Sequence, residues 1–118
     1  MKNKKIKIFI SQPMNGLTNE QIKFNRSELV AEYLKEEGLK EDDVEIIDSF
    51  FENAPHYAKP VWFLGKSLEK MSEADIVLFA DGWDEARGCI IEHSVAEAYG
   101  MEIREQDFFS QLGEHPEL

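Results

Sequence analysis

Cysteine is almost absent from this 118-residue sequence, which contains only Cys89. One cysteine cannot form an internal disulfide, and by itself it cannot build a cysteine-based metal site. The sequence also lacks any apolar run approaching the ~18–20 residues that span a bilayer. Its N-terminal segment carries lysines but neither a long apolar stretch nor a small-residue cleavage site. A cytoplasmic protein without a membrane partner is therefore the default expectation.

Basic residues are also few, because 13 lysines and arginines stand against 24 aspartates and glutamates, a net charge of −11. Proteins that bind nucleic acids through the phosphate backbone present a basic stripe, and none is visible beyond the first seven residues. A nucleic-acid polymer is therefore not an expected partner. A small-molecule ligand remains compatible with this charge, since local groups decide its binding.

The residues that are present form an alternating series of strand and helix patterns. Short apolar runs predict strands at Ile6–Ile10, Val44–Ile47, Ile76–Ala80 and Met101–Ile103. Between them we expect a helix opened by a capping box of Thr18 and Gln21 and ended by Gly38, a second over roughly Val61–Ser72 after Pro60, and a third from Cys89 to Tyr99 before Gly100. This order predicts one α/β domain over residues 1–104, with helices on both faces of a mostly parallel sheet. Residues 105–118 form a tail that docks on the core or a partner, or stays partly disordered.

The stretch from Ala74 to Ile103 contains most of the candidate functional residues. Asp81-Gly82 breaks the apolar strand, and a loop follows to Gly88. Ligands of open α/β sheets bind beyond the carboxyl ends of the strands. The residues expected on that rim are Asp81, Trp83, Asp84, Arg87 and the first helical turn. Trp83 is either a stacking surface for a planar base or a half-buried anchor of the loop.

Glu92 is the strongest candidate for a chemical role. It lies one turn into the third predicted helix and is flanked by Ile90 and Ile91, so we expect it to be partly shielded from water. Shielding tunes the pKa or the nucleophilicity of a carboxylate. The alternative is that Glu92 faces solvent and only favours the helix dipole.

A second candidate loop follows the first strand and contains Ser11, Gln12, Pro13, Met14, Asn15 and Gly16. A strand, a loop and a helix N-terminus together can hold anions and polar ligands with free backbone N–H groups. The segment matches neither a P-loop nor a GxGxxG fingerprint, so it carries no specific phosphate motif. The alternative is that Pro13 and Gly16 simply turn the chain.

His93 on the third predicted helix has two possible partners at a spacing of four residues, Glu97 and Cys89. His93 and Glu97 are four residues apart, which suits two metal ligands, but without a third ligand a surface ion pair is the better interpretation. Cys89 and His93 have the spacing of a nucleophile and its base, but no orienting third group is visible, so a buried structural thiol is the better interpretation. No metal and no cofactor is expected.

Two motifs carry a family resemblance over about Ile6 to Ile103. KIFISQPMNG and ADIVLFADGWDEARGCIIEHSVAEAYG resemble small bacterial and phage proteins of the DUF4406 type, which are related to the nucleoside 2-deoxyribosyltransferase superfamily. The resemblance implies a flavodoxin/Rossmann-like three-layer sandwich of about four to five strands and a pocket for a nucleoside or nucleotide. It also implies a homo-oligomer by analogy.

The superfamily cleaves an N-glycosidic bond with a helix-borne glutamate, and that residue corresponds to Glu92. Its aspartate at the head of the preceding strand corresponds to Asp75, and Asp81 or Asp84 could protonate the departing base. Phe9 stands where the superfamily carries an orienting tyrosine, and Ser11 could supply that hydrogen bond instead. The resemblance thus assigns catalysis to Glu92, Asp75 and Asp84, and substrate binding to Ser11, Gln12, Pro13, Met14, Gly16, Asp81, Gly82, Trp83, Arg87 and Gly88.

The superfamily also has an aspartate six residues before its glutamate, where this sequence has Ala86. Arg87 beside it could hold a phosphate or pair with a neighbouring acid. The leading expectation is cleavage of a nucleoside or nucleotide, with transfer of the sugar to another base or to water. The other interpretation is a non-catalytic nucleotide-binding or regulatory module that uses the same rim.

Overall fold

The computed structural model describes residues 4–49 and 54–106 as a four-stranded parallel sheet with three helices. The strands are β1 (Ile6–Ser11), β2 (Val44–Ile46), β3 (Ile76–Phe79) and β4 (Glu102–Glu105), in the order β2-β1-β3-β4. The helices are α1 (Asn19–Glu37), α2 (Pro60–Met71) and α3 (Arg87–Ala98). This arrangement confirms the predicted α/β class and is consistent with a flavodoxin/Rossmann-like sandwich.

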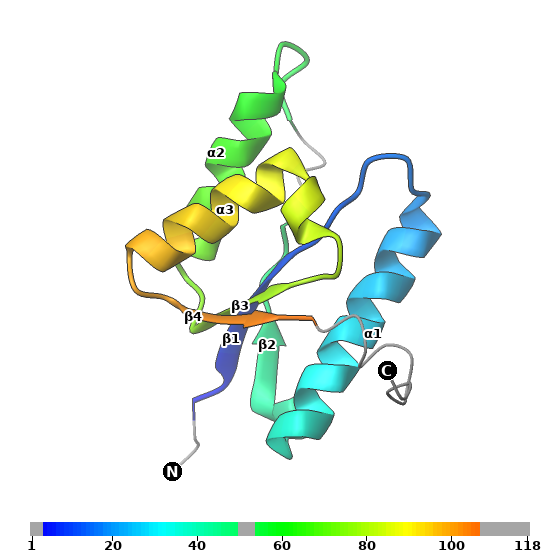
Figure 1. The fold of residues 1–118 in the computed structure, drawn as a ribbon, viewed down its shortest axis with the longest axis vertical. Helices are drawn as coiled ribbons and strands as arrows, with labels where there is room; N and C mark the ends of the chain where they lie inside the picture. Colours follow the sequence, from blue (N-terminus) through cyan, green and yellow to red (C-terminus); the bar gives the residue numbers. More distant parts are fainter. Residues whose placement is uncertain (1–3, 50–53, 107–118) are drawn as a thin grey trace, which may run out of the picture.

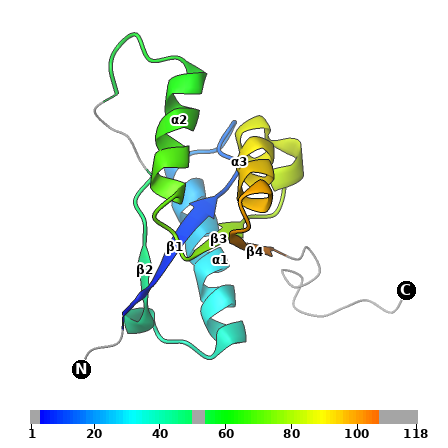
Figure 2. The same cartoon turned by 90° about the vertical axis from the view of Figure 1, so that its left-hand side faces the viewer.

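Helices cover both faces of the sheet, as Figures 1 and 2 show: α1 lies on one side, and α2 and α3 lie on the other. Side chains alternate along each strand, so β1 and β3 contribute to two apolar layers. The layer against α1 includes Ile8, Ile10, Leu29, Tyr33, Ile76 and Leu78. The layer against α2 and α3 includes Phe9, Met71, Val77, Phe79 and Ala96. The two central strands are therefore buried on both faces, as their continuous apolar runs predicted.

The ends of α1 are those that the sequence predicts. The Thr18 hydroxyl accepts a hydrogen bond from the Gln21 backbone N–H, and the Gln21 side chain accepts one from the Thr18 N–H. Gly38 ends the helix in the left-handed region with φ of 67°, where glycine avoids the steric penalty of a Cβ. Both helix signals are local, which is why the sequence alone was enough to place them.

The second helix begins at Pro60, one residue before the predicted start at Val61, since the first helical position needs no N–H donor. On the inner face of this helix, Met71 is buried and Leu68 packs against the core. Trp62 and Leu64 are only half-buried. Leu64 instead contributes to the cleft described below.

The region between β3 and β4 differs in detail from the prediction. A short 3-10 helix, Trp83–Glu85, occupies the expected loop, and α3 begins at Arg87 instead of Cys89. Gly82, with φ of 89°, makes the sharp turn that separates β3 from this helix. The last strand runs to Glu105, later than predicted, because it pairs with β3 from Ile76 to Phe79. Residues 107–118 of the expected tail lie outside the described residues.

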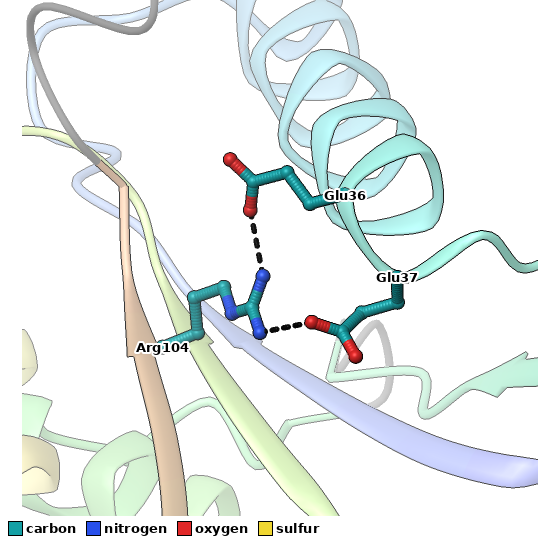
Figure 3. Close-up of polar contacts among 3 residues, drawn as sticks. All are labelled: Glu36, Glu37 and Arg104. Atoms are coloured by element: carbon teal, nitrogen blue, oxygen red, sulfur yellow. Dashed lines mark hydrogen bonds and ion pairs between the residues drawn. The ribbon is translucent and has the colours of Figure 1, made fainter.

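Arg104 ties the edge strand β4 to the C-terminal end of α1 (Figure 3). Its Nη1 lies 2.6 Å from Glu36 Oε1, and its Nη2 pairs with Glu37. The guanidinium also lies 5.1 Å from the centre of the Tyr33 ring. A cation at this place is favoured by two carboxylates and by the negative end of the helix dipole. The contact holds the edge strand β4 against the C-terminal end of α1.

The connections define where a ligand can enter. The chain leaves β1 outward to β2 and then passes back across β1 to form β3 on the other side. The strand order therefore reverses between β1 and β3, and ligands of such sheets bind beyond the carboxyl ends of those two strands. Among the described residues, no helix is long and apolar enough to cross a membrane.

Candidate functional site

An open cleft of about 1300 Å³ lies beyond the carboxyl ends of β1 and β3. Its walls come from the β1–α1 loop, the first half of α2 and the start of α3. The residues that carry polar groups into it include Ser11, Gln12, Ser67, Asp81, Glu85, Arg87 and Glu92. Apolar side chains also line it, among them Phe9, Leu17, Phe63, Leu64 and Ile91. A concave surface with a few convergent polar groups is the usual form of a small-molecule site.

Glu92 lies in the wall of this cleft and is only 8% exposed. The buried positions of α3 are Cys89, Glu92, His93 and Ala96, a three-and-four spacing that forms one inward stripe. The predicted shielding of Glu92 is therefore confirmed, and the solvent-facing alternative is wrong. The reason differs from the one expected, because Ile90 and Ile91 are themselves exposed.

The carboxylate of Glu92 is held by hydroxyl groups from two other elements. Ser11 Oγ, at the end of β1, donates a hydrogen bond of 2.6 Å to Glu92 Oε1. Burial raises the pKa of the Glu92 carboxyl above its ordinary value, while hydrogen bonds from Ser11 and from Ser67 on α2 act to lower it. The site thus contains a desolvated carboxylate that is oriented by at least one strong hydrogen bond.

Ser67 is a site residue that sequence reasoning missed. It is half-buried, lines the cleft and lies on the face of α2 between Leu64 and Leu68. A serine within the apolar stripe of a helix is a usable signal, because a hydroxyl on a buried face needs a partner. The sequence does not show, however, that α2 would face α3.

Cys89 is buried beside Ser11 and Glu92. Burial raises the pKa of its thiol, a hydrogen bond with Ser11 lowers it, and the nearby Glu92 carboxylate raises it. A thiol with a raised pKa carries little thiolate at neutral pH and is a poor nucleophile. The structure therefore favours the buried structural thiol over the Cys89–His93 nucleophile pair.

The ring nitrogens of His93 are directed to carboxylates. Nε2 lies 2.7 Å from Glu105 Oε2 and Nδ1 lies 3.7 Å from Glu97 Oε1. The predicted contact between His93 and Glu97 is thus present, with the His93 ring buried and the Glu97 side chain exposed. Among the described residues, no group of three or more His, Cys, Asp and Glu side chains could hold a metal ion.

Trp83 serves as an anchor of the loop. Its ring stacks on His93 at a centroid distance of 3.9 Å and an angle of 8°, and it also contacts Phe79. Trp83 is half-buried and does not line the cleft. Of the two interpretations left open for this residue, the structure therefore agrees with the half-buried anchor.

The other predicted residues of this loop divide into two groups. Asp81, Gly82, Arg87 and Gly88 line the cleft. Asp84 is exposed and does not line it. The cleft instead receives Glu85, which sequence reasoning missed. The 3-10 helix causes this exchange, because its tight turn directs neighbouring side chains to different sides.

The opposite rim is formed by Ser11 at the end of β1 and by Gln12, Pro13 and Met14 of the β1–α1 loop. Gly16 does not line the cleft but turns the chain with φ of 81°. The two loops approach closely, since a Cβ added at Gly82 would lie 3.4 Å from Pro13 Cγ. Both loops therefore contribute to one continuous rim.

Asp75 lies at the amino end of the central strand β3, directly before its first residue, and thus at the opposite end of the strands from the cleft. Its Oδ2 accepts a 2.8 Å hydrogen bond from the Lys7 backbone N–H, and its own N–H donates to the Lys7 carbonyl at 2.8 Å. Glu92 is bonded instead to Ser11, at the carboxyl end of β1. The structure therefore does not bring Asp75 together with Glu92, and its contacts are those of a residue that fixes the register of β1 and β3.

One family comparison covers most of the chain. The family model described as "Domain of unknown function (DUF4406)" matches residues 6–105. The match begins with β1 and ends with β4, so it includes the whole sheet and both loops of the cleft. No curated protein and no solved structure matches the chain.

Proposed function

Because the chain belongs to the DUF4406 family, whose description assigns no activity, we propose its function from the cleft itself. The proposed activity is cleavage of the N-glycosidic bond of a nucleoside or nucleotide, with Glu92 as the nucleophile. The observation that carries the proposal is the buried Glu92 carboxylate, fixed by Ser11 at 2.6 Å in the wall of an open cleft.

The chemistry requires a carboxylate that is both available and oriented. An oxygen of Glu92 attacks the anomeric carbon opposite the base, and the bond between that carbon and the base nitrogen breaks through an oxocarbenium-like transition state. The electron pair of the broken bond goes to the base. The glycosyl ester on Glu92 is then attacked by water, which gives hydrolysis, or by another base, which gives transfer.

A second group must give the departing base a proton. Asp81 and Glu85 line the cleft with Glu92 and are the proposed donors. Asp84, which the resemblance also offered, is exposed outside the cleft. We assign substrate contacts to Ser11, Gln12, Pro13, Met14, Gly82, Arg87 and Gly88, all of which line the cleft.

The likeness to the nucleoside 2-deoxyribosyltransferase superfamily supports this reaction class. The superfamily orients its glutamate with a tyrosine hydroxyl. Phe9 in this chain has no hydroxyl, and Ser11, two residues further along β1, donates to Glu92 from the same face of the strand. We propose that Ser11 replaces the tyrosine in this function.

One observation favours a second function. Ala86 stands in place of the superfamily's aspartate, and Asp84, two residues earlier, lies outside the cleft. If no other group protonates the base, the same cleft would bind a nucleotide without turnover. Tight binding in calorimetry without any product would identify such a regulatory or binding module.

The test is incubation of the pure protein with ribo- and deoxyribonucleosides and their monophosphates, with and without an acceptor base. We expect chromatography to resolve free base, and a new nucleoside where the acceptor is used. Glu92→Gln should abolish this product. Glu97→Gln, an exposed position on the same helix, is the matched control and should retain it. Turnover by Glu92→Gln at the wild-type rate would refute the proposed nucleophile.

A further inference from the structure

Gln106, directly after β4, holds the chain at the point where it leaves β3. Its backbone N–H donates a 2.8 Å hydrogen bond to the Phe79 carbonyl oxygen, and its side-chain Oε1 accepts one of 2.9 Å from the Asp81 backbone N–H. In a parallel ladder, a residue donates to the residue before its partner and accepts, through its own carbonyl, from the residue after it. The side-chain oxygen of Gln106 therefore takes the place that its backbone carbonyl would have if the two strands continued.

The other end of the Gln106 amide is held by α1. Its Nε2 donates a 3.0 Å hydrogen bond to Glu32 Oε2, and both side chains are half-buried. An ionised carboxylate only accepts hydrogen bonds, so Glu32 fixes which end of the amide faces the Asp81 N–H. Gln106 is thus an oriented link from α1 to the backbone of Asp81.

The residue before Asp81 is fixed by the other central strand. The Ala80 N–H donates a 2.9 Å hydrogen bond to the Ser11 carbonyl oxygen, while the Ser11 hydroxyl holds Glu92 at 2.6 Å. The chain at Asp81 and the carboxylate of Glu92 are therefore both positioned from Ser11, one through the main chain and the other through the side chain. A mechanism with two carboxyl groups requires such a fixed separation between nucleophile and proton donor.

Glu85, the other carboxylate proposed as a proton donor, is less constrained. Its backbone N–H donates to the Gly82 carbonyl oxygen at 3.0 Å, a bond within the same turn, whereas the Asp81 N–H is bonded to a residue that follows β4. The Asp81 carboxyl is also one methylene closer to its backbone, so fewer torsions must be ordered to place it. A fixed backbone therefore positions the Asp81 carboxyl more narrowly than that of Glu85.

We propose that Asp81 is the acid that protonates the departing base and that Gln106 is its positioning residue. This inference rests on the proposed N-glycosidic activity. As Glu92 forms its bond to the anomeric carbon, the electron pair of the breaking bond passes to the base nitrogen, which takes the proton of the Asp81 carboxyl. The water or acceptor base that attacks the glycosyl ester then returns a proton to Asp81. Gln106 does not line the cleft, so it acts only through Asp81.

The experiment compares nucleosides with analogues whose base needs less protonation. The pairs are 2′-deoxyguanosine with its N7-methyl derivative, whose base leaves without a proton, and 2′-deoxyuridine with its 5-fluoro derivative, whose base is a better leaving group. Gln106→Leu should lower kcat/KM for the parent nucleosides about tenfold or more, but for the analogues less than about threefold. Asp81→Asn should show the same selectivity with a larger loss.

Arg104→Leu is the matched control. Arg104 also ties β4 to α1, but it does so through Glu36 and Glu37 and not through Asp81. It should change the rates of parent and analogue alike. The double substitution of Glu32→Gln with Gln106→Glu exchanges the amide and the carboxylate, so it keeps an acceptor for the Asp81 N–H and a donor at position 32. It should restore the parent rate to within about threefold of the wild type.

Amide hydrogen exchange at Asp81 tests the hydrogen bond without any substrate. It should be faster in Gln106→Leu and unchanged in Arg104→Leu. The proposal is overturned if exchange is unchanged in Gln106→Leu, if this variant loses rate equally on parent and analogue, or if Arg104→Leu shows the selective loss. A selective loss in Glu85→Gln but not in Asp81→Asn would also overturn it. These outcomes leave Glu92-dependent turnover in place, whereas no wild-type product from any substrate would refute the proposed function itself.

Discussion

Family resemblance assigns both Glu92 and Asp75 to catalysis, but the structure places them at opposite ends of the parallel strands. Glu92 is buried at the carboxyl edge, and its partner is a serine hydroxyl in the wall of a cleft. Asp75 is exposed at the amino edge, and its partner is the backbone N–H of Lys7. The environment therefore separates the two, because only a partly desolvated carboxylate in a cleft can both meet a ligand and have a tuned pKa.

The largest expected difference between these two positions is in turnover. Glu92→Gln should lower the rate roughly 10³-fold or more, because the amide cannot form the glycosyl ester. Asp75→Asn should leave the rate per folded molecule within about twofold, because it lies away from the cleft. Product formation under saturating substrate measures both, with circular dichroism to confirm folding. A comparable loss of rate in the two variants would remove the distinction drawn here.

Ser11 provides the next test, because it is the group that holds Glu92 in place. Ser11→Ala should lower the rate about tenfold to a hundredfold and should raise the pKa of Glu92 further, since a hydrogen bond that favours the charged form is lost. Carbon NMR of labelled glutamate would follow this pKa without any substrate. Ser67→Ala should move it in the same direction. A pKa unchanged in both variants would contradict the positioning role of the two hydroxyls.

A smaller effect is expected on the stability of the fold when Asp75, at the amino end of β3, is replaced. Asp75→Ala removes a 2.8 Å hydrogen bond to the Lys7 N–H and should reduce the free energy of unfolding by about 1 kcal/mol. Urea unfolding measures the change. Glu73→Ala, at an exposed position two residues earlier, controls for the loss of a nearby charge. Equal midpoints in these two variants would show that Asp75 does not fix the strand register.

The smallest expected effect is the dependence of stability on pH that Glu92 contributes. Its pKa in the folded protein lies above the ordinary value of 4.5, so the folded state binds this proton more tightly than the unfolded state. Stability from this group is therefore present below the ordinary pKa and is lost as the pH rises through the raised value. Unfolding of wild type and Glu92→Gln across this range should show a steeper decline in the wild type. The opposite sign would contradict the raised pKa.

Local sequence signals were enough for the elements and for part of the site. The capping box at Thr18 and Gln21, the left-handed Gly38 and the proline at the start of α2 each act over a few residues. The buried strands β1 and β3 were visible as apolar runs for the same reason. Strand alternation with helices then fixed the class of the fold, and the rule for parallel sheets placed Ser11 and Asp81 at the same edge.

Contacts between distant segments could not be predicted from the sequence alone. Ser67 meets Glu92 only because α2 and α3 cover the same face of the sheet. Trp83 was ambiguous until its ring was found stacked on His93. Glu85 lines the cleft in place of the predicted Asp84, because both lie in a 3-10 turn whose side-chain directions depend on packing.

The sequence by itself determined which segments become the strands and the three helices, where α1 begins and ends, and that Glu92 would stand near the start of a helix at the rim. Those features depend on backbone preferences and apolar spacing within a few residues. Only the tertiary structure decided that Glu92 is buried against Ser11, that Asp75 is held at the far end of the strands, and that Gln106 holds the backbone of Asp81. Such features depend on strand order and on which helix faces meet, and these are set by the packing of the whole core.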